Sequence, residues 1–324
     1  MPMLGPTAHD VEVAVSAGRP ADLVAVVLTY RGRRRVDACL DALVRQVDER
    51  TPVVVVDNAS GDGTAEAVRA GHPRVAVVRN PVNSGYGAGM NLGLERARTH
   101  APSRVLLLTD DTVLEPGAVT ELASALDTHE RAGAVGPLLV LDDARVWSAG
   151  GVLTGPGRHP GHLGRGELPA SWRQGGARAV RWLDGAALML RTCALDELRA
   201  PGGGAATGRG GGLGPFREDF FMYWEEVELQ SRLSAAGWDL LCVPSAAARQ
   251  QPGLMPPYLS SRNRIRFLTG SGSTGAAVVA SAGDCLRAAR ASVRQASRWQ
   301  ARAHLRGVHH GWTGGLDHEL AARR

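Results

Sequence analysis

The stretch Val105-Leu106-Leu107-Leu108-Thr109-Asp110-Asp111-Thr112 is an apolar run of strand length that stops at two adjacent carboxylates. Sheets of the α/β class bind their ligands at the carboxyl ends of their strands. Two aspartates at such an end suit Mg²⁺ or Mn²⁺, which take oxygen ligands, and such a metal commonly accompanies a diphosphate. The alternative interpretation is a strand end with solvated acids, or an aspartate that caps the following helix.

Strand-like and helix-like segments alternate on both sides of this stretch. The expected strands are Leu23–Thr29, Val53–Val56, Val75–Val78, Val105–Leu108 and Val135–Leu141. The expected helices are Val36–Val47, Asp62–Ala70, one from Asn83 or Ser84 to about Arg98, and one from Pro116 to about His129. This alternation predicts an α/β fold with a mostly parallel sheet covered on both faces.

The rest of the chain changes character several times. Residues 1–20 show no period and are expected to be a loose tail, and the α/β domain is expected over residues 21–270. Inside this domain, residues 150–178 lose the pattern, and residues 201–214 are a glycine-dominated loop insert. The remaining expected elements are an extended segment at Arg181–Leu190, a helix at Trp224–Ala236, a strand at Trp238–Val243 ending at Pro244, and a basic helical extension over 271–324 that stays helical from about residue 275 to about Arg306.

Composition bounds the class of protein. Hydrophobic residues make up 44% of the 324, enough for a full core, and the formal charge is +5 with arginine as the basic residue throughout. The four cysteines are far apart, without metal-ligand spacing, which indicates a reducing compartment. No signal peptide and no apolar run of membrane-spanning length is apparent, so we expect a cytoplasmic protein.

Two more ligand-type patterns follow expected strands. Asp57 comes directly after Val53–Val56, where an aspartate can accept hydrogen bonds from the imide or ribose of a nucleotide; the plainer interpretation is an ordinary Asp-Asn turn. The segment from Asn83 to Asn91 is rich in glycine at a helix start, where free N–H groups attract phosphate. Its spacing is neither that of a P-loop nor that of a dinucleotide fingerprint.

A third pattern is the acidic pair Glu225-Glu226, which follows the aromatic run Phe220-Phe221-Met222-Tyr223-Trp224. The helix dipole stabilises negative charge at a helix start. Aromatic walls raise a carboxylate pKa by desolvation, which suits a general base. The alternative is a set of helix-start acids on a solvated face.

In their order along the chain, these segments resemble the family 2 glycosyltransferases with the GT-A fold, a Rossmann-like architecture, and are most similar to the rhamnosyltransferase-like branch. The resemblance covers about residues 22–270. The matching pieces are Val27-Leu28-Thr29-Tyr30, residues 56–64, residues 83–91, Leu108-Thr109-Asp110-Asp111-Thr112, residues 184–190, residues 220–229 and Arg262-Asn263-Arg264.

The resemblance implies a role for each matching residue. The catalytic base is Glu226, with Glu225 as its partner, and the metal site is Asp111 with Thr109. The residues implied for the nucleotide and donor sugar are Thr29, Tyr30, Asp57, Asn83, Gly85, Asn91, Asp110, Gly185 and Ala186.

Three departures from the family pattern bear on this assignment. Thr109 stands where the metal motif usually has an acid or Asn, and Glu226 stands where the base is usually aspartate, so the base could shift to Glu225. A histidine found in many relatives is replaced by the sequence Ala248-Arg249-Gln250-Gln251-Pro252. We therefore expect weakened dependence on Mg²⁺ or Mn²⁺, with Arg249 or an arginine of residues 262–266 partly neutralising the diphosphate.

The function expected from the resemblance is inverting transfer of a sugar from a nucleoside diphosphate donor to an acceptor hydroxyl. The branch favours a dTDP-deoxysugar such as dTDP-L-rhamnose, with UDP-sugars as the second choice. Two rivals remain: a sugar nucleotidylyltransferase, which would need a Lys-containing glycine loop after the first strand, and a non-catalytic nucleotide-sugar binding or scaffold protein.

Arginines recur every fourth residue near the end of the chain, at Arg290, Arg294, Arg298, Arg302 and Arg306. On one helix this spacing makes a basic stripe that suits an anionic membrane surface and a lipid-linked acceptor. The alternative is a solvated face on a helix packed against the catalytic domain. Nucleic acid is not expected as a partner, because no aromatic-interleaved basic platform accompanies the stripe. Peripheral contact would be with the inner face of the membrane.

Overall fold

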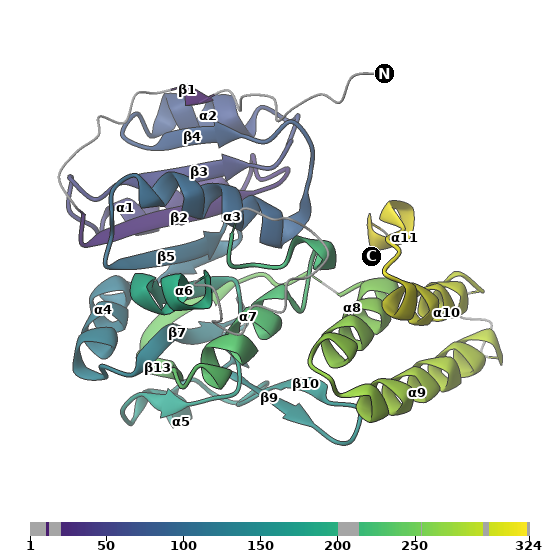
Figure 1. Cartoon of the computed structure of the whole chain (residues 1–324). Helices are drawn as coiled ribbons and strands as arrows, with labels where there is room; N and C mark the ends of the chain where they lie inside the picture. The colour runs from purple at the N-terminus through teal and green to yellow at the C-terminus, as the bar shows by residue number, and fades with distance from the viewer. Residues whose placement is uncertain (1–10, 13–20, 200–213, 254, 294–297, 323–324) are drawn as a thin grey trace.

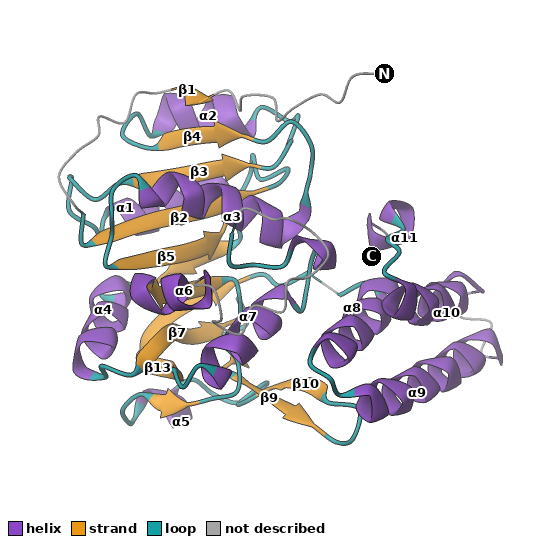
Figure 2. Cartoon of the chain, in the orientation of Figure 1, coloured by secondary structure: helices purple, strands orange, loops and turns teal. Residues whose placement is uncertain are grey.

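The computed structural model describes residues 11–12, 21–199, 214–253, 255–293 and 298–322 (Figure 1). One large sheet forms its centre, with helices on both sides (Figure 2). In spatial order its strands are β1 (Val11–Glu12), β4 (Ala76–Arg79), β3 (Val53–Asp57), β2 (Leu23–Thr29), β5 (Arg104–Thr109), β12 (Ala187–Arg191), β7 (Ala132–Val140), β13 (Asp239–Gln250) and β11 (Arg178–Ala179), while β6 (Thr112–Leu114) pairs with β13 and β8 (Val146–Ser148) with β7.

The strands β4, β3, β2 and β5 run parallel, as the strand–helix alternation predicts. Their register places Thr29 opposite Asp57 and Leu28 opposite Thr109, so the carboxyl ends of three strands share one edge. Strand β12 then lies antiparallel between β5 and β7. The predicted class, an α/β fold of the GT-A type with C-terminal helices, is confirmed.

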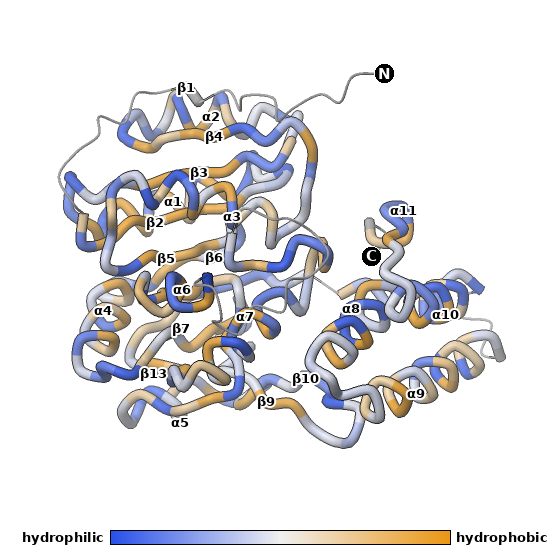
Figure 3. Tube along the Cα trace, viewed as in Figure 1, coloured by the Kyte–Doolittle hydropathy of each residue, from blue (hydrophilic) through white to orange (hydrophobic). Residues whose placement is uncertain are grey.

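Alternate residues of the central strands face opposite sides of the sheet, because side chains alternate along a strand. Val26 belongs to the core cluster on one side and Val27 to the cluster on the other. The first side is covered by α3 (Gly85–Arg98), α6 (Thr192–Arg199) and α7 (Glu225–Ala235), and the second by α1 (Val36–Val44), α2 (Thr64–Gly71) and α4 (Ala118–Thr128). Figure 3 shows the apolar strands enclosed between more hydrophilic helix surfaces.

Helix α3 lies unusually close to strand β2. A Cβ added at Gly93 would come within 2.3 Å of Val26 Cγ1, and one at Gly89 within 2.6 Å of a Leu28 methyl. The two glycines therefore let the helix approach the sheet and bring its N-terminus to the edge where the strands end.

The C-terminal helices differ from the single long helix expected. Helix α9 (Thr274–Val293) and helix α10 (Arg298–Thr313) are separate and pack against each other and against α8 (Pro257–Gly270); α11 (His318–Ala322) follows. Arg290 thus lies on one helix and Arg298, Arg302 and Arg306 on another, while Arg294 lies outside the described residues. The fourfold spacing did not reveal this break, because arginine is a good helix former at every position.

Three element boundaries also differ from expectation. Helix α4 begins at Ala118 rather than at Pro116, because Gly117 at φ 86° forms the turn before it. Strand β13 continues past Pro244 to Gln250, with a register shift between Val243 and Ala247 that accommodates the proline. Within Arg181–Leu190 the strand starts only at Ala187.

Residues 146–173 contain elements that the sequence did not predict. They are β8, the hairpin of β9 (Gly151–Thr154) and β10 (His159–His162), and the short helix α5 (Ala170–Arg173). The glycine-rich insert 201–214 lies outside the described residues except for Gly214, and the same holds for most of the expected N-terminal tail. Across the helices that the structure describes, none combines the length and the apolar character needed to cross a membrane.

The close approach of α3 gives a stability prediction. Gly93→Ala should lower the free energy of unfolding by about 1–3 kcal/mol, because the added methyl overlaps a Val26 methyl. The matched control is Gly283→Ala in α9, where an added Cβ meets no atom within 4 Å. That variant should gain up to about 1 kcal/mol from helix propensity. Thermal unfolding of both variants measures the difference, and equal effects of the same sign would contradict the packing argument.

Candidate active site

The carboxyl ends of β2, β3 and β5 gather predicted site residues at one edge of the sheet. Thr29 Oγ1 donates a hydrogen bond to Asp110 Oδ2 at 2.5 Å, which links the end of β2 to the acids after β5. Asp57 and Thr109 end the neighbouring strands. Tyr30 follows Thr29 and is 38% exposed, so its ring remains accessible beside the site.

A cavity of about 500 Å³ opens next to Asp57. This volume lies within the usual range for small-molecule sites. Asp57 is buried, and its Oδ1 accepts a hydrogen bond from the backbone N–H of Ser60 at 2.9 Å. Its other carboxylate oxygen is available to accept a hydrogen bond from a ligand. The cavity is lined by Asp57, Ala59, Ser60, Gly61, Gly63, Glu66, Arg79, Asn80 and Pro81.

Asp110 is held by an arginine that sequence analysis did not single out. Arg35 Nη2 lies 3.1 Å from Asp110 Oδ1 and its Nε lies 3.2 Å from the same oxygen. Burial raises the pKa of Asp110, while Thr29 and Arg35 oppose that rise. Because its oxygens are engaged by these two side chains, Asp110 is a poor metal ligand. Its contacts instead join the ends of β2 and β5.

Asp111 is better placed for a cation. Its Oδ1 accepts the hydroxyl of Thr109 at 2.5 Å, and burial followed by the neighbouring Asp110 raises its pKa. Gln250 lies opposite Thr112 in the β6–β13 pair, and its Oε1 is buried without a hydrogen-bond partner. No cluster of three or more His, Cys, Asp or Glu suited to a metal occurs among the described residues. The donor set is therefore one carboxylate with neutral oxygens nearby.

A network centred on Asn58 shapes the start of α3. Asn58 Nδ2 donates to Asn83 Oδ1 and to the Gly85 carbonyl, each at 3.0 Å. Gly85 has φ 84°, and a Cβ there would lie 1.8 Å from the Phe221 carbonyl oxygen, so only glycine fits. Asn58 was not predicted as a site residue, and its position in the Asp57-Asn58 turn was the available signal.

Asn91 acts at a distance from the cavity. Its amide donates to the Phe216 carbonyl and to Glu218 Oε1, each at 2.9 Å, and its Oδ1 accepts the Phe216 N–H. These bonds tie α3 to residues 216–218, so Asn91 can shape a donor pocket only through that segment.

The aromatic run before the acidic pair forms a tight turn. Phe221, Tyr223 and Trp224 have φ of 68°, 69° and 76°, a left-handed conformation that is uncommon for large side chains. The Tyr86 N–H donates to the Phe221 carbonyl at 2.7 Å, which anchors the turn to α3. Trp224 is the last residue before α7, so the turn directs Glu225 and Glu226 inward.

The two glutamates enter a dry region without partners for one oxygen each. Glu225 is 3% exposed, whereas Glu226 keeps intermediate exposure. Oε2 of both side chains is buried without a hydrogen bond. Burial raises the pKa of Glu225 to about 7. Burial, then Glu225 and Asp184, raise the pKa of Glu226 well above its ordinary value.

Gly185 and Ala186 lie between these glutamates and the aspartate edge. The Gly185 carbonyl accepts the buried Tyr86 hydroxyl at 2.7 Å, and the Ala186 carbonyl accepts the Thr109 N–H at 3.0 Å. A Cβ on Gly185 would lie 3.5 Å from Glu226 Cβ. The structure thus joins the acids after β5 to those of α7 through one short segment.

Asp184 precedes that segment and is surrounded by aromatic rings that sequence analysis missed. Trp147 Nε1 donates to Asp184 Oδ2 at 3.1 Å, and His162 stacks against Trp147 with ring centroids 4.7 Å apart. His162 comes from residues 150–178, where the sequence lost its periodicity, and Trp147 lies just before them.

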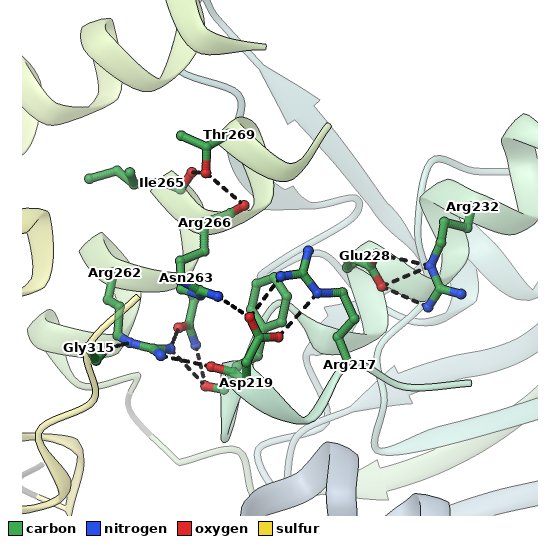
Figure 4. A network of polar contacts seen from close by, with 11 residues as sticks. Arg217, Asp219, Glu228, Arg232, Arg262, Asn263, Ile265, Arg266, Thr269 and Gly315 are labelled. Atoms are coloured by element: carbon green, nitrogen blue, oxygen red, sulfur yellow. Dashed lines mark hydrogen bonds and ion pairs between the residues drawn. The ribbon is translucent and has the colours of Figure 1, made fainter. Parts of the chain in front are cut away.

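The arginines of residues 262–266 form hydrogen bonds and ion pairs within the protein (Figure 4). Arg262 is 1% exposed and donates to the Gly315 and Asp219 carbonyls, and burial lowers its pKa to about 10. Arg264 pairs with buried Asp284 at 2.8 Å, and Arg266 pairs with Asp219. Of the arginines expected to meet a diphosphate, Arg249 is the one that remains exposed, and it lies opposite Val113 near Asp111.

Comparison with known proteins agrees with this architecture. Residues 24–150 match the model of the glycosyl transferase family 2. An N-acetylglucosaminyl-diphospho-decaprenol L-rhamnosyltransferase of Mycobacterium tuberculosis is 29% identical over 242 residues, covering 69% of this chain and 74% of the relative.

Two solved structures share the fold at low identity. GalNAc-T7 with UDP, GalNAc and Mn²⁺ aligns with a TM-score of 0.58 and 13% identity over 77% of this chain and 48% of that one. S. aureus TarS 1–349 with UDP aligns with a TM-score of 0.52 and 17% identity over 76% of this chain and 65% of that one. This chain therefore spans less than two thirds of either structure, and these likenesses show the fold alone.

The fold is of the GT-A type, and the matching family model together with the L-rhamnosyltransferase relative indicates a glycosyltransferase enzyme. Over residues 24–150 the chain is similar to the family 2 glycosyltransferases, and over 242 residues it is similar to an L-rhamnosyltransferase.

Burial of Glu225 makes stability depend on pH. Its folded pKa of about 7 exceeds the ordinary 4.5, so the folded protein binds this proton more tightly than the unfolded chain. That contribution is complete below pH 4.5 and is lost as pH rises through the folded pKa of about 7. We expect Glu225→Gln to exceed the wild type in unfolding free energy by ~1–3 kcal/mol at about pH 8, with the difference vanishing near pH 4.

Denaturant unfolding across this pH range measures the effect, with Glu95→Gln on the exposed side of α3 as the matched control. A difference between Glu225→Gln and wild type that does not change with pH would show that Glu225 is not held in a dry environment.

Proposed function

We propose that this enzyme transfers a deoxysugar such as L-rhamnose, with inversion, from a nucleoside diphosphate donor to a hydroxyl of a lipid-linked acceptor. The observation that carries the proposal is Glu226: a largely buried carboxylate with a raised pKa, an unpartnered oxygen and residual exposure. A base must be reachable by the acceptor and poised near the working pH. Glu225 is less accessible, and we assign it as the partner that helps to raise the pKa of Glu226.

The chemistry follows from these positions. The acceptor hydroxyl attacks the anomeric carbon, Glu226 takes the hydroxyl proton as the new C–O bond forms, and the bond to the diphosphate breaks. A single displacement of this kind inverts the anomeric centre. Because the site is dry, the carboxylate lacks competing water, which strengthens its interaction with the reacting hydroxyl.

The donor nucleotide is placed in the cavity beside Asp57. The buried carboxylate can accept an imide or ribose hydrogen, and Asn80 and Ser60 line the same cavity. The relative from M. tuberculosis transfers L-rhamnose, which favours a dTDP donor, whereas the solved neighbours hold UDP. We place dTDP-sugars first and UDP-sugars second.

A divalent cation fits this site as a loosely held partner. Mg²⁺ commonly binds one or two carboxylates together with substrate phosphates and water. Asp111 would supply the carboxylate, and the orphaned Gln250 Oε1 a neutral oxygen. When bound, Mg²⁺ or Mn²⁺ would offset charge on the diphosphate. Arg249 is exposed at the same edge and would share that task.

Contact with an anionic membrane would bring the enzyme to a lipid-linked acceptor at the cytoplasmic face. Helix α9 exposes the apolar side chains of Val278, Val279 and Leu286, which are 48–56% exposed. Helices α9 and α10 contain a single acid, Asp284, which is buried. Their exposed charged residues are Arg287, Arg290, Arg298, Arg302 and Arg306. An apolar face edged by arginine suits an anionic lipid surface.

The rival functions now differ in support. A nucleotidylyltransferase would need a Lys-containing glycine loop after β2, whereas residues 30–35 contain no lysine and one glycine. A non-catalytic scaffold would not require Glu225 and Glu226, whose ionised forms are destabilised by burial. Release of pyrophosphate from a nucleoside triphosphate would favour the nucleotidylyltransferase. Nucleotide binding without any transfer or donor hydrolysis would favour the scaffold.

Substitution of the base tests the proposal. Glu226→Gln should lower kcat by about 10²–10⁴-fold, because general base catalysis contributes that much, while nucleotide affinity is retained. Transfer to a polyprenyl-diphosphate sugar acceptor is measured with dTDP-rhamnose and UDP-sugars, and calorimetric titration of dTDP, UDP and GDP with and without Mn²⁺ measures binding. Full activity of Glu226→Gln would show that the base assignment is wrong. We expect Glu225→Gln to be less active than the wild type, because removal of the Glu225 charge lowers the pKa of Glu226.

A flotation assay tests membrane contact. We expect the enzyme to float with vesicles of phosphatidylcholine and phosphatidylglycerol, to stay behind with phosphatidylcholine alone, and to detach as salt rises. Leu286→Asp should abolish flotation. Leu168→Asp, at another exposed leucine outside the C-terminal helices, should not. Equal binding of both vesicle types, or flotation that survives Leu286→Asp, would contradict the proposed surface.

A further inference from the structure

The turn before the acidic pair requires an external support. Phe221, Tyr223 and Trp224 all have positive φ, and large side chains persist in that conformation only where the surroundings hold the backbone. The Tyr86 N–H holds one carbonyl of the turn from the side of α3. The carbonyls of Phe220, Met222 and Tyr223 are bonded from the side of α8.

Asn263 on α8 provides the support on that side (Figure 4). Its side chain is fully buried, and Nδ2 donates to the carbonyls of Phe220, Met222 and Tyr223 at 3.0, 2.8 and 2.9 Å. Its Oδ1 accepts Arg262 Nη1 at 2.6 Å, which fixes the plane of the amide. The amide nitrogen has two N–H donors in fixed directions, so one donor is shared between two carbonyls, and a single side chain holds all three.

The glutamates depend on this turn for their position. Glu225 and Glu226 are the first residues of α7, directly after Trp224. Oε2 of each is buried and accepts no hydrogen bond, so neither carboxylate is clamped through that atom. Their placement in the site is therefore set largely by the backbone that precedes them.

We propose that Asn263 is a positioning residue for the transfer reaction, which holds the 220–224 turn so that the Glu226 carboxylate meets the acceptor hydroxyl in a water-poor site. This inference rests on the proposed role of Glu226. A loosened turn would admit water to the glutamates, and misplacement of a reacting group by about 1 Å can cost 10²-fold in rate. Asn263 touches neither donor nor acceptor, so its effect on binding is small.

The experiment compares Asn263→Ala and Asn263→Ser with Asp284→Asn. Asp284 on α9 pairs with Arg264, which follows Asn263 on α8, so its variant controls for loosening of α8 without loss of the bonds to the turn. For Asn263→Ala we expect kcat to fall by about 10²-fold, nucleotide affinity by calorimetry to stay unchanged, and the acidic limb of the kcat–pH profile to move to lower pH as water lowers the pKa of Glu226. Asn263→Ser keeps one donor and should fall between Ala and wild type, which also serves if the Ala variant does not fold.

Wild-type kcat and pH profile in Asn263→Ala would overturn the proposal. The proposal would also be overturned if Asn263→Ala and Asp284→Asn lost the same amount of kcat and neither shifted the pH profile. That result would indicate general destabilisation of the protein. The proposed function fails separately: full activity of Glu226→Gln removes the base assignment, whereas an inactive Glu226→Gln beside a fully active Asn263→Ala removes only the role of Asn263.

Discussion

The site depends on a backbone turn that only its surroundings can maintain. Residues 220–224 adopt left-handed conformations at three large side chains, and they are held between the N-terminus of α3 and the buried amide of Asn263. This turn starts α7 and delivers two carboxylates into a region that burial keeps dry. The requirement for glycine at position 85 belongs to the same constraint, because any Cβ there would displace the Phe221 carbonyl. Helix packing, backbone conformation and carboxylate chemistry are thus coupled at one point.

The aspartate edge and the glutamate pair are two groups of acids with different surroundings. At the edge, Asp110 pairs with Arg35 and accepts a hydrogen bond from the Thr29 hydroxyl, while Asp57 lines the cavity and Asp111 accepts a hydrogen bond from Thr109. On the other side, Glu225 and Glu226 each have one carboxylate oxygen without a hydrogen-bond partner, and both carry raised pKa values. Buried carboxylates whose pKa is raised by desolvation suit proton transfer, and the two glutamates are the pair in this site with the fewest side-chain partners. The short segment Gly185-Ala186 connects the two halves.

Much of the architecture could be predicted from sequence, because periodicity reports burial. Apolar runs such as Val53–Val56 predicted the parallel strands and the helices between them. The residues that follow these runs predicted which acids lie at the strand ends. The break between α9 and α10 could not be predicted, since arginine and alanine favour helix throughout. The run of β13 through Pro244 depends on a register shift that only the neighbouring strand reveals. Arg35, Asn58 and Asn263 acquire their roles from contacts 25 to 75 residues away, which no local pattern encodes.

The pKa values of the two glutamates test the account most directly. Carboxyl carbon-13 NMR of protein labelled at glutamate, with Glu225→Gln and Glu226→Gln for assignment, follows each titration in the wild-type enzyme. The account predicts that Glu225 titrates near 7 and that Glu226 titrates well above its ordinary value, with each titration altered by removal of the other charge. Titration of both near 4.5, independently of one another, would contradict a dry, coupled pair and with it the proposed general base.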